Sequence, residues 1–207
     1  MLAGTWHETG SVELLGKNWR ENDKELKPKV RCINGNLRYF HITPEQYIEF
    51  QNEIFPQKGR IVLGVDDLVP MFGMQEFYQK KIGELNLGEK MRADFAGGLA
   101  AGVPEILLLD EITNGLDDIT KHEIREIINK IRKQFGTTVV MTSQDMDDIE
   151  AVCRRLLVLD KGRNIAKKGE LANSYARVGN LIDVRKWTNE GAVTLKEKVL
   201  DVYERLD

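Results

Sequence analysis

The chain has 207 residues, of which 42% are hydrophobic and 30% are charged, and its formal net charge is −3 at pH 7. This length and composition are typical of one folded core, or of one core with a small appendage. The mildly negative charge, with basic residues scattered along the chain, argues against nucleic acid as the main partner. No apolar run approaches the roughly 18 residues that a membrane span needs, and the spacing of Cys32 and Cys153 is not that of metal ligands.

The first part of the chain predicts short strands at residues 11–15 and 29–33, on either side of a polar turn. A helix is then expected from Thr43, because Thr43 can cap it, a proline fits its first position, and a glutamine follows where a capping box needs one. Two more helices are predicted at about 61–72 and 74–80. Together these helices indicate a helical insertion between strand-rich segments.

The pattern after Gly88 is typical of alternating helices and strands. Helices and strands are predicted in turn at about 88–102, 106–110, 119–135, 137–142, 145–152 and 155–160. Short, continuously apolar strands separated by amphipathic helices indicate a parallel sheet covered on both faces. The tail at 181–207 predicts one more strand and a terminal helix.

The most informative motif is the apolar strand at 106–109, which runs straight into Asp110 and Glu111. A buried strand that delivers carboxylates at its C-terminal end is a usual way for an α/β protein to hold Mg²⁺ and a water against a nucleotide phosphate. Alone this is a weak signal, because strands often end in acids for solvation. Residues 114–117 (NGLD) strengthen it, since they place a further carboxylate within one loop of the pair.

The surrounding sequence resembles a known family over about residues 1–170. Residues 85–117 resemble the signature-to-Walker-B stretch of ATP-binding cassette (ABC) ATPases, and residues 136–165 resemble the segment that carries their switch histidine. The resemblance implies an α/β fold with a parallel-sheet core like that of P-loop NTPases and a helical subdomain at about 43–102. Residues 171–207 would be an accessory strand and helix.

The resemblance implies catalytic roles for the residues at the strand ends. Asp110 would be the Walker B aspartate that orders Mg²⁺, and Glu111 would be the general base that polarises the attacking water. Asn36 stands where a metal- and water-contacting glutamine is expected. Gln144 stands where the switch histidine is expected.

Two further segments would act across a dimer interface. The signature loop includes Asn86, Leu87, Gly88 and Glu89. In the family it opens a helix whose backbone N–H groups face the γ-phosphate of ATP held by the other subunit. Residues 114–117, which end at Asp117, would be the D-loop that crosses the same interface.

Several positions depart from the family pattern. Asn86 replaces a serine, Glu89 replaces a neutral glutamine, and Ile112 replaces a proline. Gln144 cannot titrate near neutral pH, and Asn36 is shorter than the expected glutamine by one methylene group. Together these changes suggest relaxed catalytic requirements.

The phosphate loop, G-x-x-x-x-G-K-[ST], occurs nowhere in the 207 residues. In the family its N–H groups and lysine provide most of the binding for the β- and γ-phosphates. The N-terminal strands and the phosphate loop are therefore expected to be missing. Three explanations stay open: a truncated or misassigned gene product, a degenerate subunit that complements a partner's ATP site, and a fragment whose first piece is encoded separately.

The resemblance implies an ATP-binding and ATP-hydrolysing subunit of an ABC exporter, with ATP and Mg²⁺ as cofactors. Its partners would be a transmembrane permease subunit and a second ABC ATPase subunit, at the cytoplasmic face of the cell membrane. The chain by itself should bind ATP poorly. The alternative is a non-catalytic subunit that supplies the signature loop and D-loop in trans. The related DNA-repair and chromosome ATPases need long coiled-coil insertions, which this sequence lacks.

The helical block is also the expected docking surface for the transmembrane partner. Its aromatic and methionine side chains could contribute to that surface, although most of them are expected to pack the small helical core. These residues are Phe40, Tyr47, Phe50, Phe55, Met71, Phe72 and Phe77.

Overall fold

The structure, a computed structural model, describes residues 12–55, 61–160, 163–164, 177–178 and 181–183. The chain divides into two compact units, residues 1–142 and 143–207. The predicted boundary near residue 170 stays a prediction, and the predicted terminal helix lies outside the described residues.

A parallel sheet of three strands forms the centre of the first unit, in the order β3-β4-β5. The strands are β3 (Val30–Ile33), β4 (Ile106–Asp110) and β5 (Thr138–Thr142). The register pairs Ile33 with Leu109 and Asp110 with Thr142. Because neighbouring parallel strands end at the same edge of a sheet, the loops that follow all three strands begin at one edge. The predicted α/β class with a parallel sheet is confirmed.

The predicted strand at 155–160 is not part of this sheet, so its assignment to the parallel sheet was wrong. It is divided into β6 (Arg155–Leu156) and β7 (Leu159–Asp160), which pair antiparallel with β10 (Leu181–Asp183) and β8 (Arg163–Asn164). The short β9 (Arg177–Val178) pairs with β10. Leu156 and Val158 are buried while Leu157 and Leu159 are exposed. This segment therefore buries one face only, as antiparallel strands commonly do.

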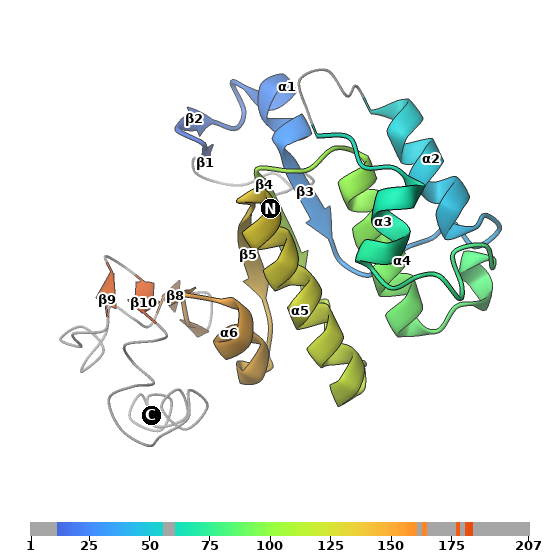
Figure 1. Cartoon of the computed structure of the whole chain (residues 1–207). Coiled ribbons are helices and arrows are strands. Elements are labelled where there is room, and N and C mark those ends of the chain that lie inside the picture. The colour runs from blue at the N-terminus through green and yellow to red at the C-terminus, as the bar shows by residue number, and fades with distance from the viewer. Residues whose placement is uncertain (1–11, 56–60, 161–162, 165–176, 179–180, 184–207) are drawn as a thin grey trace. The chain divides into compact units, whose positions relative to one another are not determined.

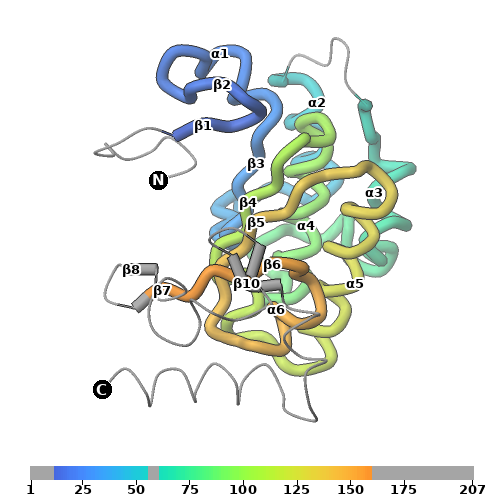
Figure 2. The backbone as a smooth tube through the Cα atoms, turned by 90° about the vertical axis from the view of Figure 1, so that its left-hand side faces the viewer, coloured from blue at the N-terminus to red at the C-terminus, as the bar shows by residue number. Residues whose placement is uncertain are grey.

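Helices α2 (Pro44–Ile54), α3 (Val65–Met71) and α4 (Leu87–Ala100) form a group beside the sheet (Figures 1 and 2). The predicted start of α2 is confirmed: Thr43 and Gln46 form a capping box, with Pro44 at the first helical position. The helix predicted at 74–80 was wrong. Gly73, at φ +61°, ends the preceding helix, and the residues after it form turns before η2 (Ile82–Glu84).

Helix α5 (Asp118–Phe135) contacts β5, and Figure 1 shows it as the long yellow helix next to that strand. It begins at the Asp117 cap and ends at Gly136, whose φ of +69° is the left-handed conformation that glycine adopts most readily. Its buried face carries Ile124, Ile128 and Ile131. In the second unit, α6 (Met146–Val152) follows an Asp145 cap.

Residues 13–29 cover part of the sheet. They contain the hairpin of β1 (Glu13–Leu14) and β2 (Lys17–Asn18), then α1 (Asp23–Leu26) and η1 (Lys27–Lys29). Trp19 and Leu26 form a buried cluster with three strand residues, Val30, Ile106 and Leu108. This cluster anchors the N-terminal ends of β3 and β4.

Candidate active site

The C-terminal ends of β4 and β5 bring together a carboxylate and a hydroxyl. Thr142 Oγ1 donates a hydrogen bond to Asp110 Oδ1 over 2.6 Å. The backbone N–H of Glu111 donates to both oxygens of Thr142, the carbonyl and Oγ1, each at 3.2 Å. Thr142 therefore orients one carboxylate and fixes the backbone of the next residue. The Asp110 side chain remains exposed at the edge of the sheet.

Glu111 has a backbone conformation that few residues other than glycine adopt, with φ at +50°. This left-handed conformation costs an L-residue about 1–2 kcal/mol. The chain keeps it because the residues on either side are anchored: Thr142 binds the N–H of Glu111, and Ile112 and Thr113 are buried. The position where the family usually has proline is thus filled by a buried isoleucine. The result is a fixed turn that takes Glu111 out of the strand direction directly after Asp110.

The signature loop and the D-loop lie side by side in the same chain. A Cβ atom at Gly88 would be only 2.6 Å from Thr120 Cγ2, and one at Gly115 would be 3.6 Å from Leu87 Cδ2. Gly88 is therefore needed for the close approach of the start of α4 to the start of α5. The two predicted interface segments form one surface of the first unit.

Asp117 caps α5 at this surface. Its carboxylate accepts hydrogen bonds from the Thr120 N–H at 3.0 Å and from Thr120 Oγ1 at 2.7 Å. These bonds, with the side-chain bond the stronger cause, hold the pKa of Asp117 below its usual range. Asp117 is thus a charged cap under the conditions of a cell, and it fixes the end of the D-loop.

The first turn of α4 is capped by its own side chains. Asn86 Oδ1 accepts from the Glu89 N–H, and Glu89 Oε2 accepts from the Asn86 N–H, each over 2.9 Å. This capping box uses two of the N–H groups at the start of the signature helix and places a carboxylate there. The N–H groups of Leu87 and Gly88 lie between these two and are not used by the box. A phosphate at this helix start would therefore meet the Glu89 carboxylate.

Asn36 lies in the loop after β3, at the same edge of the sheet as Asp110, and is exposed. Its N–H donates to Asn34 Oδ1 at 3.2 Å, and Gly35 between them has φ +69°. Such a turn closed by an asparagine side chain is a locally stable way to leave a strand.

Gln144 belongs to the second unit, where it is exposed. Next to it, Ser143 Oγ donates to Asp148 Oδ2 over 2.8 Å and accepts from the Asp145 N–H over 3.0 Å. Asp145 in turn caps α6 by accepting from the Asp147 N–H. The backbone on both sides of Gln144 is therefore well held. That Gln144 acts with Glu111 on one phosphate stays a prediction.

The residues at this edge of the sheet are suited to hold Mg²⁺ that is bound together with a nucleotide. In the part of the chain that the structure describes, no three His, Cys, Asp or Glu side chains come together as a metal site. Mg²⁺ usually keeps several waters and is held by one or two carboxylates together with substrate phosphates. The exposed carboxylate of Asp110 is a ligand of that kind. Thr142 binds one of the two carboxylate oxygens of Asp110, which leaves the other oxygen for water or a metal ion.

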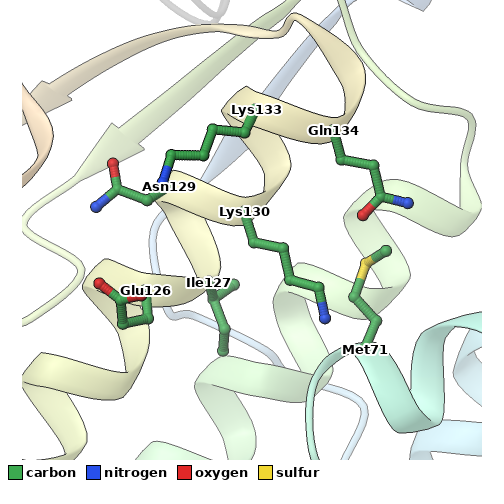
Figure 3. Close-up of a pocket in the computed structure, with 7 residues that line it drawn as sticks. All are labelled: Met71, Glu126, Ile127, Asn129, Lys130, Lys133 and Gln134. Carbon is green, nitrogen blue, oxygen red and sulfur yellow. The ribbon is translucent and has the colours of Figure 1, made fainter.

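A separate hollow lies between α3 and α5 (Figure 3). Lys130 points from α5 toward Met71 of α3 in this view. The hollow is lined by Met71, Glu126, Ile127, Asn129, Lys130, Lys133 and Gln134. It contains none of the predicted site residues, so it is not part of the candidate active site.

Sequence reasoning missed two residues of this site, Thr142 and Thr120. Both act through hydrogen bonds to an acid, Asp110 and Asp117 respectively. Thr142 could have been found, because it ends the strand that follows Asp110 and parallel strands place their ends at one edge. The contact of Thr120 with Gly88 joins residues far apart in the chain, and no local pattern indicates it.

Comparison with known proteins supports the resemblance seen in the sequence, although no protein-family model matches the chain. The chain is 30% identical over 223 residues to the energy-coupling factor transporter ATP-binding protein EcfA1 of Streptococcus thermophilus, covering 96% of the chain and 79% of EcfA1. It is 25% identical over 206 residues to the bacitracin transport ATP-binding protein BcrA of Bacillus licheniformis, covering 99% of the chain and 66% of BcrA.

A third relative is the methionine import ATP-binding protein MetN of Haemophilus ducreyi, 28% identical over 161 residues. The match includes 75% of this chain, and it spans only 46% of the length of MetN. Among solved structures, cbiO1 from Clostridium perfringens, part of the ABC transporter complex cbiONQ, superposes with a TM-score of 0.69 at 22% identity, over 96% of this chain and 73% of cbiO1.

The parallel sheet with its group of helices defines the fold of the ABC ATPases. The similarity to EcfA1 narrows this class further: the chain belongs to the family of ABC transporter ATP-binding proteins. Among the residues that the structure describes, no helix combines the length and the apolar character needed to cross a membrane.

Proposed function

We propose that this chain takes part in ATP hydrolysis within an ABC-type transporter, with Asp110 and Glu111 as its catalytic carboxylates. The observation that carries this proposal is the bond from Thr142 to Asp110, which holds an exposed carboxylate at the edge where the Asn36 turn also begins. A strand end kept only for solvation would need neither this oriented carboxylate nor the left-handed Glu111 that follows it.

The two acids have different roles in the proposed site. Asp110 would hold the waters of Mg²⁺, and Asn36 would approach the same ion or the attacking water from the neighbouring strand end. Bound Mg²⁺ would neutralise phosphate charge as the bond to the leaving group breaks. Glu111 would accept the proton of the attacking water. Its turn separates it from Asp110, so the two carboxylates can serve the water and the metal separately.

The phosphate-binding part of the site must come from outside these 207 residues. They contain no G-x-x-x-x-G-K-[ST] sequence, and that loop supplies most of the phosphate contacts in such ATPases. We therefore expect weak ATP binding by the 207 residues alone. A measured affinity in the micromolar range would contradict this expectation.

A second ABC ATPase subunit is the proposed partner of the surface that carries the signature loop and D-loop. Two apolar side chains lie exposed there, Leu87 at 44% and Ile119 at 75%. Apolar groups at this exposure, directly beside Gly115 and Asp117, favour burial against another subunit. Leu87, Gly88 and Asp117 would then face ATP held by that subunit.

A transmembrane subunit is the proposed partner of a second surface, here named the aromatic surface and made of Tyr39, Phe40, Phe50 and Ile54. All four side chains are at least 40% exposed. Tyr39 lies 6.2 Å from Phe50 and 5.1 Å from the buried Tyr47, measured between ring centres. The chain would therefore work at the cytoplasmic face of the membrane through this contact.

Export is the direction of transport that the sequence resemblance implies. The relatives do not all share one direction by name, since MetN is named for import. The direction proposed here can be checked with the complete transporter in sealed vesicles. ATP supplied on the side of the ATPase subunits should lead to release of substrate on the other side.

The alternative function is a non-catalytic subunit that supplies only its signature loop and D-loop to a partner. The capping box of Asn86 and Glu89 argues that even this contribution is altered, because it places a negative charge at the start of the signature helix. In this alternative, Asp110 and Glu111 would take no part in catalysis.

One experiment separates the two functions. The assembled transporter is purified with wild-type chain, with Glu111→Gln, or with Gly88→Val, and ATP hydrolysis is measured. Loss of a general base should reduce hydrolysis at the site that uses Glu111 by about 100-fold or more. If Glu111→Gln leaves hydrolysis unchanged while Gly88→Val abolishes it, the chain is the non-catalytic partner. If neither variant has an effect, both proposals fail.

A further inference from the structure

The turn between β1 and β2 contains a leucine that its conformation does not favour. The turn consists of Leu15 and Gly16, whose φ angles are +54° and +73°. Two-residue hairpin turns with positive φ at both positions favour asparagine or aspartate followed by glycine, and a leucine there is strained. The Leu15 side chain is 44% exposed, so core packing does not account for it either. A strained and exposed apolar residue points to a binding role.

Leu15 lines a hollow at the N-terminal edge of the parallel sheet, the edge opposite to Asp110. The hollow has a volume of about 560 Å³, within the range of about 300–1,000 Å³ that is usual for small-molecule sites. Its apolar lining comes from segments that lie far apart in the chain. These residues are Leu15, Pro28, Ile61, Val103, Pro104 and Phe135. None of the predicted site residues is among them, so a ligand here would not overlap the candidate active site.

Hydrogen bonds fix the floor of this hollow. The Glu105 N–H donates to the Lys29 carbonyl, and the Glu105 carbonyl accepts from the Thr138 N–H, each over 2.9 Å. Thr137 Oγ1 donates to the Pro104 carbonyl, also over 2.9 Å. These bonds tie the beginnings of the three strands together, so the floor has its shape without a ligand. The backbone N–H of Glu105 is already used, which argues against pairing with the main chain of a peptide at this residue.

The charged side chains at the rim of the hollow pair with one another. Lys29 Nζ lies 3.2 Å from Glu105 Oε1 and 3.8 Å from Glu25 Oε1. Lys17 Nζ lies 2.5 Å from Glu25 Oε2. Two bases therefore face two acids, and an ionic ligand would have to compete with one of these pairs. An uncharged apolar ligand leaves all of them intact, so the charge balance favours a ligand of that kind.

We propose that this hollow is a binding site for a small, uncharged, apolar molecule, with Leu15 as its main apolar contact. The bound molecule would cover Leu15 and Ile61, which are 44% and 55% exposed in the chain without a ligand. Removing apolar side chains of this size from water stabilises a complex. Because the hollow and Asp110 lie at opposite edges of the sheet, this proposal does not rest on the proposed ATP site.

Fluorescence of N-phenyl-1-naphthylamine, a neutral apolar probe, tests the site in the 207-residue chain. The probe should bind saturably, with one equivalent per chain, and its fluorescence should rise as it leaves water. The probe 8-anilino-1-naphthalenesulfonate has the same rings and a negative charge. It should bind at least about tenfold more weakly, because the rim offers no unpaired base to hold the charge. Equal or tighter binding of the charged probe would overturn the choice of an uncharged ligand.

Leu15→Asn separates binding from folding. Asparagine adopts the left-handed conformation more readily than leucine, so this variant should unfold at a higher urea concentration than wild type. It should nevertheless bind the neutral probe about tenfold or more weakly, because its main apolar contact is lost. Ile61→Asn should weaken binding as well. Leu157→Asn is the matched control, at a leucine of the second unit that is 42% exposed, and should leave binding of the probe unchanged.

Amide NMR shifts locate the bound probe. The neutral probe should shift the amide signals of Val103 and Gly136, which line the hollow, and leave that of Phe50 on the aromatic surface unchanged. The proposal is overturned by an absence of saturable binding, by wild-type affinity in Leu15→Asn, or by shifts confined to residues outside the hollow. A lower urea midpoint in Leu15→Asn would also overturn it, because leucine would then serve stability. A dimer that excludes the probe and dissociates in Leu15→Asn would assign the hollow to a second copy of the chain instead.

Discussion

Gly97 of α4 lies directly against the Tyr47 ring of α2. A Cβ there would lie 2.0 Å from Tyr47 Cε1 and 2.6 Å from its Cδ1, distances that no side chain can keep. Tyr47 is buried, so its ring has little room to withdraw. We predict that Gly97→Ala destabilises the chain by about 1–3 kcal/mol, even though alanine favours a helix over glycine by about 1 kcal/mol. Urea unfolding of the 207-residue chain measures the change.

Gly98→Ala is the matched control, because it makes the same chemical change one residue along. Its Cβ would lie 3.1 Å from Ile33 Cδ1, the flexible end of a side chain that can shift by a few tenths of an ångström. The helix preference of alanine should then dominate, and Gly98→Ala should be neutral or stabilising by up to about 1 kcal/mol. Equal destabilisation by both variants would contradict the assignment of Tyr47 as the obstacle.

Asp94 makes the stability of the fold depend on pH. Burial raises its pKa from near 3.8 when unfolded to about 6 in the folded chain. Between these values the folded state binds more protons than the unfolded state, so stability falls as pH rises from about 4 to about 6. The full cost, up to about 3 kcal/mol, is present above pH 6.

Asp94→Asn removes that cost while keeping a side chain of nearly the same size and shape. We predict a higher melting temperature than wild type at pH 8, with a difference that shrinks toward zero as pH approaches 4. Thermal unfolding followed by circular dichroism at a series of pH values measures it. A difference that is constant with pH would show that Asp94 does not titrate in this window.

At the scale of elements, the N-terminus of α4 combines a structural cap with a proposed functional loop. Asn86 accepts from the Glu89 N–H at 2.9 Å. We predict that Asn86→Ala destabilises the chain by about 1 kcal/mol, because it removes this cap. Asn86→Ser should retain most of the stability, since serine is an equally good cap. Urea unfolding compares the two, and equal loss in both variants would mean that the Asn86 side chain does not cap the helix in solution.

The elements that the sequence predicted well are those whose signals are local. Thr43, Pro44 and Gln46 predict the start of α2 within four residues, and the structure has that capping box. The strand at 106–110 was correct because a continuous apolar run needs burial on both faces. The segment 155–160 has a similarly apolar sequence, yet it is buried on one face only. Its partners, β8 and β10, come later in the chain, and no local signal indicates them.

The candidate site shows the same division between local and distant information. Asp110 and Glu111 were predicted from the apolar run that directly precedes them, and the structure confirms that Asp110 ends a buried strand. The support of Asp110 could not be read from the sequence, because Thr142 bonds to it from the neighbouring strand. This contact joins residues 32 positions apart, so it depends on the fold.

At the scale of the whole molecule, the proposed transporter needs two separate contact surfaces. The surface that carries the signature loop and D-loop has Leu87 and Ile119 exposed, and the aromatic surface has Phe40 and Phe50 exposed. The Phe40 carbonyl accepts from the Gly83 N–H at 3.0 Å, so the backbone below the aromatic surface is fixed while its side chains are exposed. Substitutions at these side chains can therefore remove contacts to a partner without removing core packing.

We predict that the double variant Phe40→Ala/Phe50→Ala loses binding to the transmembrane subunit while the chain stays folded, with a loss of stability of about 1–3 kcal/mol for the two half-buried rings together. The two side chains are 50% and 40% exposed, so truncating them leaves no enclosed cavity of the kind that a fully buried ring would leave. Binding is measured by co-purification from membranes that contain the transporter, and stability by urea unfolding.

Two controls make this prediction specific. Ile119→Ala truncates an exposed apolar residue on the other surface, so it should keep binding to the transmembrane subunit while weakening association with the second ATPase subunit. Phe72→Ala truncates a buried ring that stacks on Phe95 at 6.3 Å between ring centres, and it should cost about 3–5 kcal/mol of stability. Retained membrane binding in the Phe40→Ala/Phe50→Ala chain would exclude the aromatic surface as the docking site. Loss of that binding in Ile119→Ala as well would mean that the transmembrane subunit recognises only the assembled pair of ATPase subunits.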